Sequence, residues 1–225
     1  RNSYFEAKTR RDKLNIQEKD RALREKIRCK LVELGYNDSE SHKIASFDPY
    51  DINAHADWFD PQWMFGITEG FDIVIGNPPY IQLQKAYDKT RKFADLYKYQ
   101  NYITFDRMGD IYCLFYERGI QLLRDSGYLA LITSNKWMRA GYGEKLREFF
   151  LKYNPKMLID LGPDVFENAT VDTNILIIEK TSNKGELKAL KIDEKSKDID
   201  FLEKVKNDAV FLNKLGKDVW FIGSD

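Results

Sequence analysis

The sequence predicts an α/β fold, in which a parallel sheet is flanked by helices and preceded by a charged helical segment. Three observations lead to this class. Four short apolar runs of strand length recur along the chain. Segments with helical periodicity separate the first three of these runs. The joints between these segments are short, as in β-α-β units. Hydrophobic residues make up 43% of the 225 residues, which is enough for a sizeable core.

The amino-terminal segment, residues 1–45, is expected to be a charged helical segment. Basic residues outnumber acidic ones 11 to 6 over residues 1–34. Its apolar side chains are sparse and form a narrow stripe, Leu23, Ile27, Leu31 and Leu34. A helix with so narrow a stripe can lie on a core but cannot form one, so we interpret it as a solvated structural segment. Within the segment, residues 4–34 are expected to form one long helix, which Gly35 ends.

Four apolar runs in the middle of the chain are expected to be strands. They are residues 71–75, 128–133, 156–161 and 174–179, and helices over 110–125 and 144–151 are expected between the first three. The first run is rich in β-branched residues, which is typical of a parallel strand buried on both faces. Residues 181–225 hold many lysines and acidic residues, and we expect a linker or the start of another module there.

Composition excludes several classes of protein. No stretch approaches 18 consecutive apolar residues, so no membrane partner is expected. The two cysteines and two histidines lack metal-ligand spacing, so no metal site is expected, and the lone thiols favour a cytoplasmic location. The 36 basic and 36 acidic residues balance, so any contact with nucleic acid must come from local patches. Because the chain begins with Arg1 rather than Met, we expect it to be a piece of a longer protein.

A proline-rich turn directly follows the first expected strand. It reads Asn77-Pro78-Pro79-Tyr80, and in open α/β sheets ligands bind beyond the carboxyl ends of the strands. Two consecutive prolines remove two backbone donors and fix two φ angles, so the turn is stiff. It presents the side-chain oxygen of Asn77 and backbone carbonyls as acceptors, beside the ring of Tyr80. The alternative without a function is a stiff loop that only ends the strand.

These groups suit an amine attached to a flat ring. The amine donates its two hydrogens to the acceptors, and the ring stacks on Tyr80. Accepting both hydrogens favours a more tetrahedral nitrogen, whose lone pair can attack a sulfonium methyl group without a strong base. Aromatic faces and carbonyl oxygens can stabilise the positive sulfonium.

The segment 71–80 resembles the catalytic motif of adenine-specific DNA amino-methyltransferases. The resemblance covers roughly residues 46–180 and continues through residues 109–115, 127–137, 158–166 and 173–178. It implies a partial Rossmann-like methyltransferase sheet with the later strands only. It also implies methyl transfer from S-adenosylmethionine to the exocyclic amine of a flipped adenine. In that reaction Asn77 and Pro78 accept from the amine, Pro79 stiffens the turn, and Tyr80 and Phe166 pack on the two faces of the base.

The sequence of residues 46–80 is most similar to that of fused type IIG restriction–modification enzymes. In those enzymes one chain holds an endonuclease domain, a methyltransferase domain and a target-recognition domain. The resemblance therefore implies double-stranded DNA as a partner and residues 46–180 as the catalytic half of a methyltransferase domain. It also implies a target-recognition module that starts within residues 181–225. Magnesium would serve only a nuclease domain outside this chain.

The glycine-rich cofactor loop of that family does not occur ahead of the turn. The glycines before Asn77 are Gly35, Gly66, Gly70 and Gly76, and none forms a Gly-x-Gly turn. The cofactor-binding residues therefore stay unassigned. We expect the upstream half of the methyltransferase domain to lie elsewhere in the parent protein, and this chain alone to be inactive.

Residues 81–107 combine six basic residues with six interleaved aromatic residues, against three acidic ones. Cations suit phosphates and rings suit unpaired bases, so we expect this segment to flank the extruded base, with Lys89, Arg91 and Lys92 binding the substrate. The alternative is a solvated loop over the core.

Two other functions also stay open. One is a protein-glutamine methyltransferase, because a side-chain amide also presents a planar NH2. The other is a non-catalytic DNA-docking module.

Overall fold

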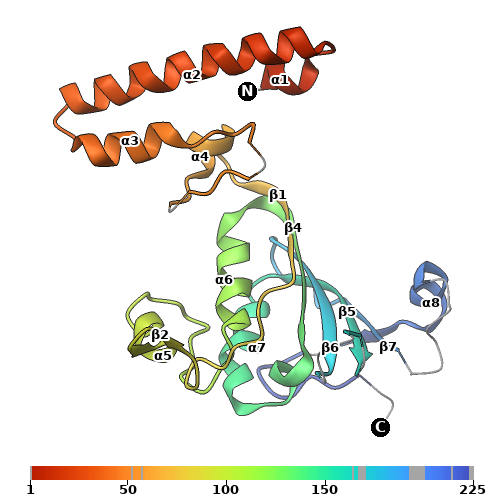
Figure 1. Ribbon diagram of the computed structural model, residues 1–225. Coiled ribbons are helices and arrows are strands. Elements are labelled where there is room, and N and C mark those ends of the chain that lie inside the picture. The colour runs from red at the N-terminus through yellow and green to blue at the C-terminus, as the bar shows by residue number, and fades with distance from the viewer. Residues whose placement is uncertain are drawn as a thin grey trace. The chain divides into compact units, whose positions relative to one another are not determined.

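A computed structural model describes residues 2–51, 53–56, 58–163, 165–166, 171–192, 201–213 and 215–222. The chain divides into two compact units, residues 1–68 and residues 69–225. Both are drawn in Figure 1, and each is described by itself below.

The first unit is helical. Its elements are α1 (Asn2–Glu6), α2 (Arg10–Glu33), α3 (Asp38–Ser46) and α4 (Pro61–Phe65). α2 begins after Thr9, whose side chain accepts a hydrogen bond from the backbone N–H of Asp12. Gly35 follows α2 with a φ of 92°, a conformation that suits glycine, so the expected helix end is confirmed. α3 then runs back beside α2 (Figure 1).

Arg24 ties α2 to the last residues of α3 and to Phe47, which follows it. Arg24 is 8% exposed, and its guanidinium donates hydrogen bonds to the carbonyls of Ala45 (3.1 Å) and Phe47 (3.0 Å). Trp63 donates from its indole nitrogen to a carbonyl of α3 at 3.2 Å. Buried donors need such acceptors. Residues 46–68 therefore fold with the helices, whereas the sequence analysis placed a boundary after residue 45.

The second unit is centred on a sheet that has six strands in the described residues. Across the sheet they are β1 (Phe71–Gly76), β4 (Leu123–Ser134), β6 (Thr173–Glu179), β5 (Asn154–Gly162), β7 (Leu187–Lys191) and β8 (Val210–Leu212). β1 is parallel to β4, β5 is parallel to β7, and these four strands all run in one direction. Helix α6 (Tyr112–Leu122) leads into β4, and α7 (Glu144–Phe150) leads into β5. The predicted α/β class is confirmed.

β6 departs from the parallel sheet that the sequence predicted, because it is antiparallel to both β4 and β5. Only residues 163–172 connect β5 to β6. A parallel crossover needs about a dozen residues or more, so this short connection returns the chain in the opposite direction. The carboxyl ends of β1, β4 and β5 and the start of β6 consequently lie side by side, at the same end of the strands.

One hydrophobic core joins the helices of this unit to the strands. Its fully buried members include Tyr116 of α6, Phe150 of α7 and Leu158 of β5. Trp220, near the end of the chain, is 1% exposed and packs on Trp137 with ring centroids 5.3 Å apart. The tail therefore completes this unit through β7, β8 and Trp220, whereas the sequence analysis expected a linker or the start of another module. Its apolar runs, residues 210–212 and 219–222, are short and follow a highly charged stretch, so the sequence does not indicate a share in the core.

Residues 81–107 form a small lobe beside α6. A hairpin of two short strands, β2 (Tyr87–Asp88) and β3 (Arg91–Lys92), is followed by α5 (Phe93–Tyr97) (Figure 1). Leu83 and Ala94 of the lobe form a second buried cluster with Ile111 and Leu114. The remaining short elements of the unit are the 3-10 turns η1 (Asn135–Met138) and η2 (Gly141–Gly143) and the helix α8 (Phe201–Asp208).

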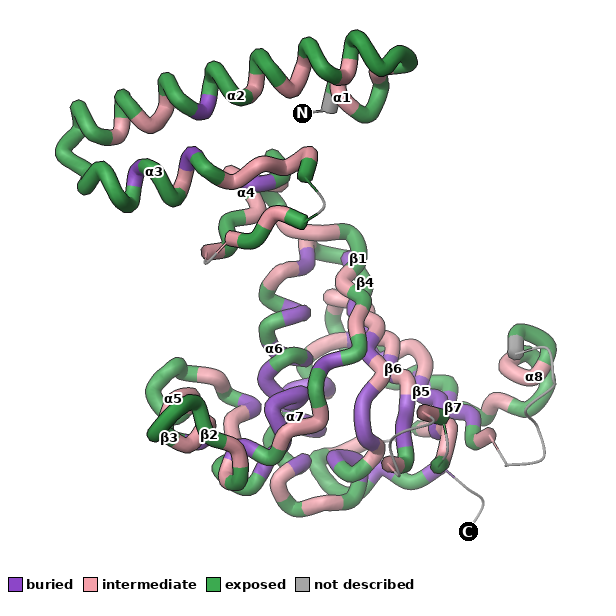
Figure 2. Tube along the Cα trace, in the orientation of Figure 1, coloured by how far each residue is buried: buried purple, intermediate pink, exposed green. Residues whose placement is uncertain are grey.

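β1 lies at the edge of the sheet and is more exposed than the sequence predicted. Ile73 is 63% exposed and Ile75 is 78% exposed. No residue of β1 is buried, in contrast to β4 (Figure 2). Among the described residues β1 pairs with β4 alone. The expectation of a strand buried on both faces was wrong, because such burial needs a second neighbouring strand and a covering layer as well as an apolar sequence.

Candidate active site and nucleic-acid interface

The Asn-Pro-Pro-Tyr turn, residues 77–80, leaves the carboxyl end of β1. Gly76 of β1 pairs with Leu131 of β4, so the turn begins beside the last residues of β4. The turn has no cis peptide bond. Asn77 is exposed, whereas Pro78 is buried. Burial of Pro78 holds the turn against the body of the unit while the Asn77 amide stays accessible, as an acceptor for a ligand must.

Tyr80 is held by two neighbouring elements. Its hydroxyl donates to the carbonyl of Ile132 in β4 at 3.4 Å. Its ring meets Tyr112 of α6 edge-on, with ring centroids 6.1 Å apart and an angle of 85° between the planes. Burial raises the pKa of Tyr80, so the phenol is protonated at neutral pH. The side chain is only half-buried, which leaves ring surface on which a flat ligand can stack.

Polar side chains gather where β4 and β5 end and β6 begins. Asn135, after β4, donates from Nδ2 to a carboxylate oxygen of Asp160 in β5 at 3.0 Å. Asn174 of β6 donates to the carbonyl of Thr133 at 3.3 Å. Oδ1 of Asn174 and Oγ1 of Thr173 are buried without a partner in the described part of the chain. The sequence analysis missed this cluster, although each residue stands at the end of an expected strand, which is a usable signal.

Arg147 and Gly143 shape the loop that follows β4. Arg147 is 4% exposed, and its guanidinium donates to the carbonyls of Trp137 and Ala140 (3.1 Å for Ala140). Burial lowers the pKa of this arginine. Gly143 lies so close to the Trp137 carbonyl that any side chain there would overlap it. These constraints fix the position of Tyr142, which stands inside the same loop.

A buried polar group, Asp110, lies just before α6. Asp110 is 6% exposed. Burial raises the pKa of its carboxyl, while the charge of Lys136 and a hydrogen bond from Tyr142 act in the opposite direction. The hydroxyl oxygens of Tyr142 and Tyr112 are 2.7 Å apart. Burial also raises the pKa of both phenols. The structure thus connects Tyr142 to Tyr112, the residue that packs on Tyr80.

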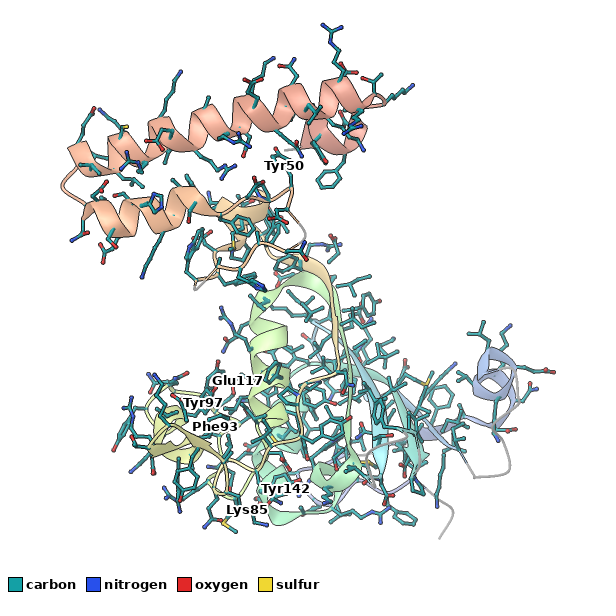
Figure 3. The ribbon with its side chains drawn as sticks, in the orientation of Figure 1. Tyr50, Lys85, Phe93, Tyr97, Glu117 and Tyr142 are labelled. Carbon is teal, nitrogen blue, oxygen red and sulfur yellow. The ribbon has the colours of Figure 1, made fainter. Side chains whose placement is uncertain are left out.

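The three basic residues singled out in the lobe share one hairpin. Lys89 occupies its turn with a φ of 52°, and Arg91 is exposed on β3. Nζ of Lys92 lies 5.6 Å from the centroid of the Tyr87 ring. On α6, Glu117 faces the lobe and anchors it (Figure 3). The cations are thus gathered on one exposed feature, but no contact within the described residues joins them to the turn at 77–80.

Phe166 follows β5 and is half-buried. Within the described residues no ring contact links it to Tyr80, and residues 167–170 lie outside the described part of the chain. Its packing on a base opposite Tyr80 therefore stays a prediction.

In the described residues, no three His, Cys, Asp or Glu side chains are grouped so that they could hold a metal ion. None of the helices described is both long enough and apolar enough to cross a membrane.

Residues 3–166 match the family model of the Eco57I restriction-modification methylases. The match covers more than half of the chain, and the chain therefore belongs to this family. It starts within α1, so it includes the charged helices, which the sequence analysis left outside the resemblance.

The chain is similar to longer proteins. It is 36% identical over 142 residues to the type II restriction enzyme and methyltransferase RM.Eco57I of Escherichia coli, covering 62% of this chain and 13% of that protein. It is 28% identical over 174 residues to the type II methyltransferase M.BanIII of Aneurinibacillus aneurinilyticus, covering 76% of this chain and 28% of that protein. A solved structure of the ATP-dependent type ISP restriction-modification enzyme LlaBIII bound to DNA matches with a TM-score of 0.51 at 17% identity, covering 77% of this chain and 14% of that one. That likeness supports the fold alone, and the chain spans less than a third of each of these proteins.

Proposed function

We propose that this chain is the substrate-binding half of a DNA methyltransferase that modifies the exocyclic amine of adenine. The observation that carries the proposal is the turn at residues 77–80, which places an exposed amide beside a held aromatic ring at the carboxyl end of β1. Family membership supports it, as do relatives whose names describe type II methyltransferases. An amine on a nucleobase is favoured over a protein amide because it is attached to a flat ring, which needs both acceptors and a stacking surface. Adenine is the base implied by the resemblance of residues 71–80 to adenine-specific enzymes.

The residues of the turn have distinct roles in this proposal. Oδ1 of Asn77 and the carbonyl of Pro78 each accept one hydrogen of the amine. With both hydrogens engaged, the lone pair of the nitrogen is directed out of the plane of the base. Pro79 keeps the turn stiff, because its ring fixes φ. Tyr80 stacks on one face of the base, and Phe166 packs on the other.

The methyl donor in this proposal is S-adenosylmethionine, which supplies an electrophilic methyl group on a positive sulfonium. The residues present fit the acceptor side of such a site, since carbonyl and amide oxygens and aromatic rings suit a neighbouring positive charge. The sequence shows no glycine-rich turn ahead of β1. We infer that cofactor-binding strands pair with β1 on the side where no strand lies among the described residues, and that a further layer covers Ile73 and Ile75, which are exposed here. This chain alone is then expected to transfer no methyl group.

DNA is the proposed partner, and the target base leaves the duplex at a cost of roughly a few kcal/mol. Lys89, Arg91 and Lys92 are proposed to contact phosphates beside the extruded base, because they are gathered on one hairpin next to aromatic side chains. Relatives named as both restriction enzyme and methyltransferase favour a parent protein that also carries a nuclease. Magnesium would belong to that nuclease.

The decisive experiment is Asn77→Ala in the complete natural protein, assayed by transfer of labelled methyl to DNA and to a glutamine-containing protein. We expect wild type to label DNA, and the variant to lose on the order of 10²-fold or more in rate, by analogy with removal of one charge-stabilising group. DNA affinity should survive, because the amide contributes little to phosphate binding. Asn15→Ala, at an exposed position of α2, is the matched control. Full methylation by Asn77→Ala would remove this residue from the mechanism, and labelling of the protein alone would refute the proposed function.

A further inference from the structure

The hydroxyl groups of Tyr112 and Tyr142 are joined by a hydrogen bond. Their oxygens lie 2.7 Å apart. Tyr112 is 0% exposed. Tyr112 stands at the start of α6, whereas Tyr142 belongs to η2. The hydrogen bond therefore fastens the loop after β4 to the helix before it.

Either hydroxyl can be the donor in this hydrogen bond. Burial raises the pKa of both phenols, so both are protonated at neutral pH. The bond restrains the hydroxyl end of the Tyr112 ring.

Tyr112 is also the ring that contacts Tyr80 of the candidate active site. The two rings meet edge-on, at 6.1 Å between centroids and 85° between planes, which is a geometry that aromatic pairs favour. The hydroxyl of Tyr80 reaches the carbonyl of Ile132 at 3.4 Å, which is long for an O–H···O hydrogen bond. The edge-on contact with Tyr112 therefore restrains the orientation of the Tyr80 ring.

We infer that Tyr112 and Tyr142 are positioning residues, which fix the plane of Tyr80 for stacking on the extruded base. This inference rests on the proposed function. Neither residue touches the base, so both act through Tyr80. The benefit is preorganisation, because a ring that is already oriented need not be ordered when the base arrives. A misplacement of about 1 Å near reacting atoms costs on the order of 10²-fold in rate.

A purely structural role for the hydrogen bond between Tyr112 and Tyr142 predicts a different result. In that case, loss of a hydroxyl would lower stability, and activity would fall only as far as the protein unfolds. A positioning role predicts a change in the stacking of the target base, and in the rate of methyl transfer, in protein that is fully folded. The two roles are separated by measuring base stacking and kinetics together.

The test is Tyr142→Phe in the complete natural protein, which removes the hydroxyl that pairs with Tyr112 and keeps the ring. Tyr112→Phe is a second variant, which removes the other hydroxyl of the pair. Tyr153→Phe is the matched control, because this half-buried ring packs on Phe149 with centroids 5.2 Å apart and its hydroxyl has no partner within the described residues. Each protein is assayed for kcat and KM on DNA. The emission of 2-aminopurine at the target position is also recorded, since it depends on what the base stacks against.

For Tyr142→Phe we expect kcat to fall by about 10-fold to 10²-fold. KM for DNA should stay within about threefold, because uniform binding is unaffected. The 2-aminopurine emission should differ from wild type in this variant and match wild type in Tyr153→Phe. Wild-type kcat and emission in both Tyr142→Phe and Tyr112→Phe would overturn the inference. So would an activity loss that only tracks unfolding, with unchanged emission. If wild type methylates no DNA at all, the proposed function fails and the inference falls with it.

Discussion

Glu117 is the side chain on which the attachment of the basic lobe most depends. It is 4% exposed on α6, and both of its oxygens accept hydrogen bonds. One oxygen, Oε2, takes the backbone N–H and the hydroxyl of Thr104, each at 2.9 Å. The other, Oε1, takes the backbone N–H of Ile103 at 3.2 Å and the amide of Gln121 at 3.4 Å. Removing one oxygen should therefore affect the two backbone groups unequally.

The perturbation is Glu117→Gln, which keeps the shape and replaces one oxygen by NH2. The remaining oxygen should take the place of Oε2, where the two shorter hydrogen bonds are made. The NH2 group then faces the N–H of Ile103, which loses its acceptor. Leaving a buried donor unpaired costs about 1–3 kcal/mol. Because this N–H is only partly buried, we expect the lower part of that range, about 1–2 kcal/mol, or roughly a factor of 5–30 in the opening equilibrium.

The assay is native-state hydrogen exchange at the amides of Ile103 and Thr104. Exchange at Ile103 should accelerate by roughly 5-fold to 30-fold, while Thr104 keeps most of its protection. Glu148→Gln, at an exposed position of α7, is the control and should leave both amides unchanged. Equal loss of protection at both amides would refute the assignment of acceptors, and wild-type exchange at Ile103 would show that Glu117 does not anchor the lobe.

Two further predictions concern charge. Burial raises the pKa of Asp110, so the native state keeps a proton that the unfolded chain has lost. The free energy of unfolding should then fall as pH rises from the ordinary aspartate pKa of about 3.9 through the raised value, and Asp110→Asn should abolish this fall in urea denaturation. The same pH slope in both proteins would contradict the prediction. Replacing Lys89, Arg91 and Lys92 by Gln should reduce the slope of log K for DNA against log salt by about 2–3, measured by binding titrations across salt. An unchanged slope would remove the hairpin from the interface. The control neutralises three exposed cations of α2, Lys19, Arg21 and Lys26.

The local features of the chain were predictable because they depend on neighbouring residues. The run Phe71–Ile75 predicted β1, and the prolines after it predicted a stiff turn at the carboxyl end of that strand. Gly35 predicted the end of the first long helix. Each of these patterns acts through backbone geometry and burial over a few residues, so reading along the sequence is enough.

Features that join distant segments required the three-dimensional structure. The sequence by itself determined the α/β class, the acceptor turn at residues 77–80 and the cationic character of the lobe. Only the tertiary structure decided that β6 runs antiparallel, that Trp220 completes the core and that Tyr142 hydrogen-bonds to Tyr112. The physical reason is that a hydrogen bond or a ring contact between segments 30 residues apart depends on where the whole backbone brings them, and local periodicity carries no information about that.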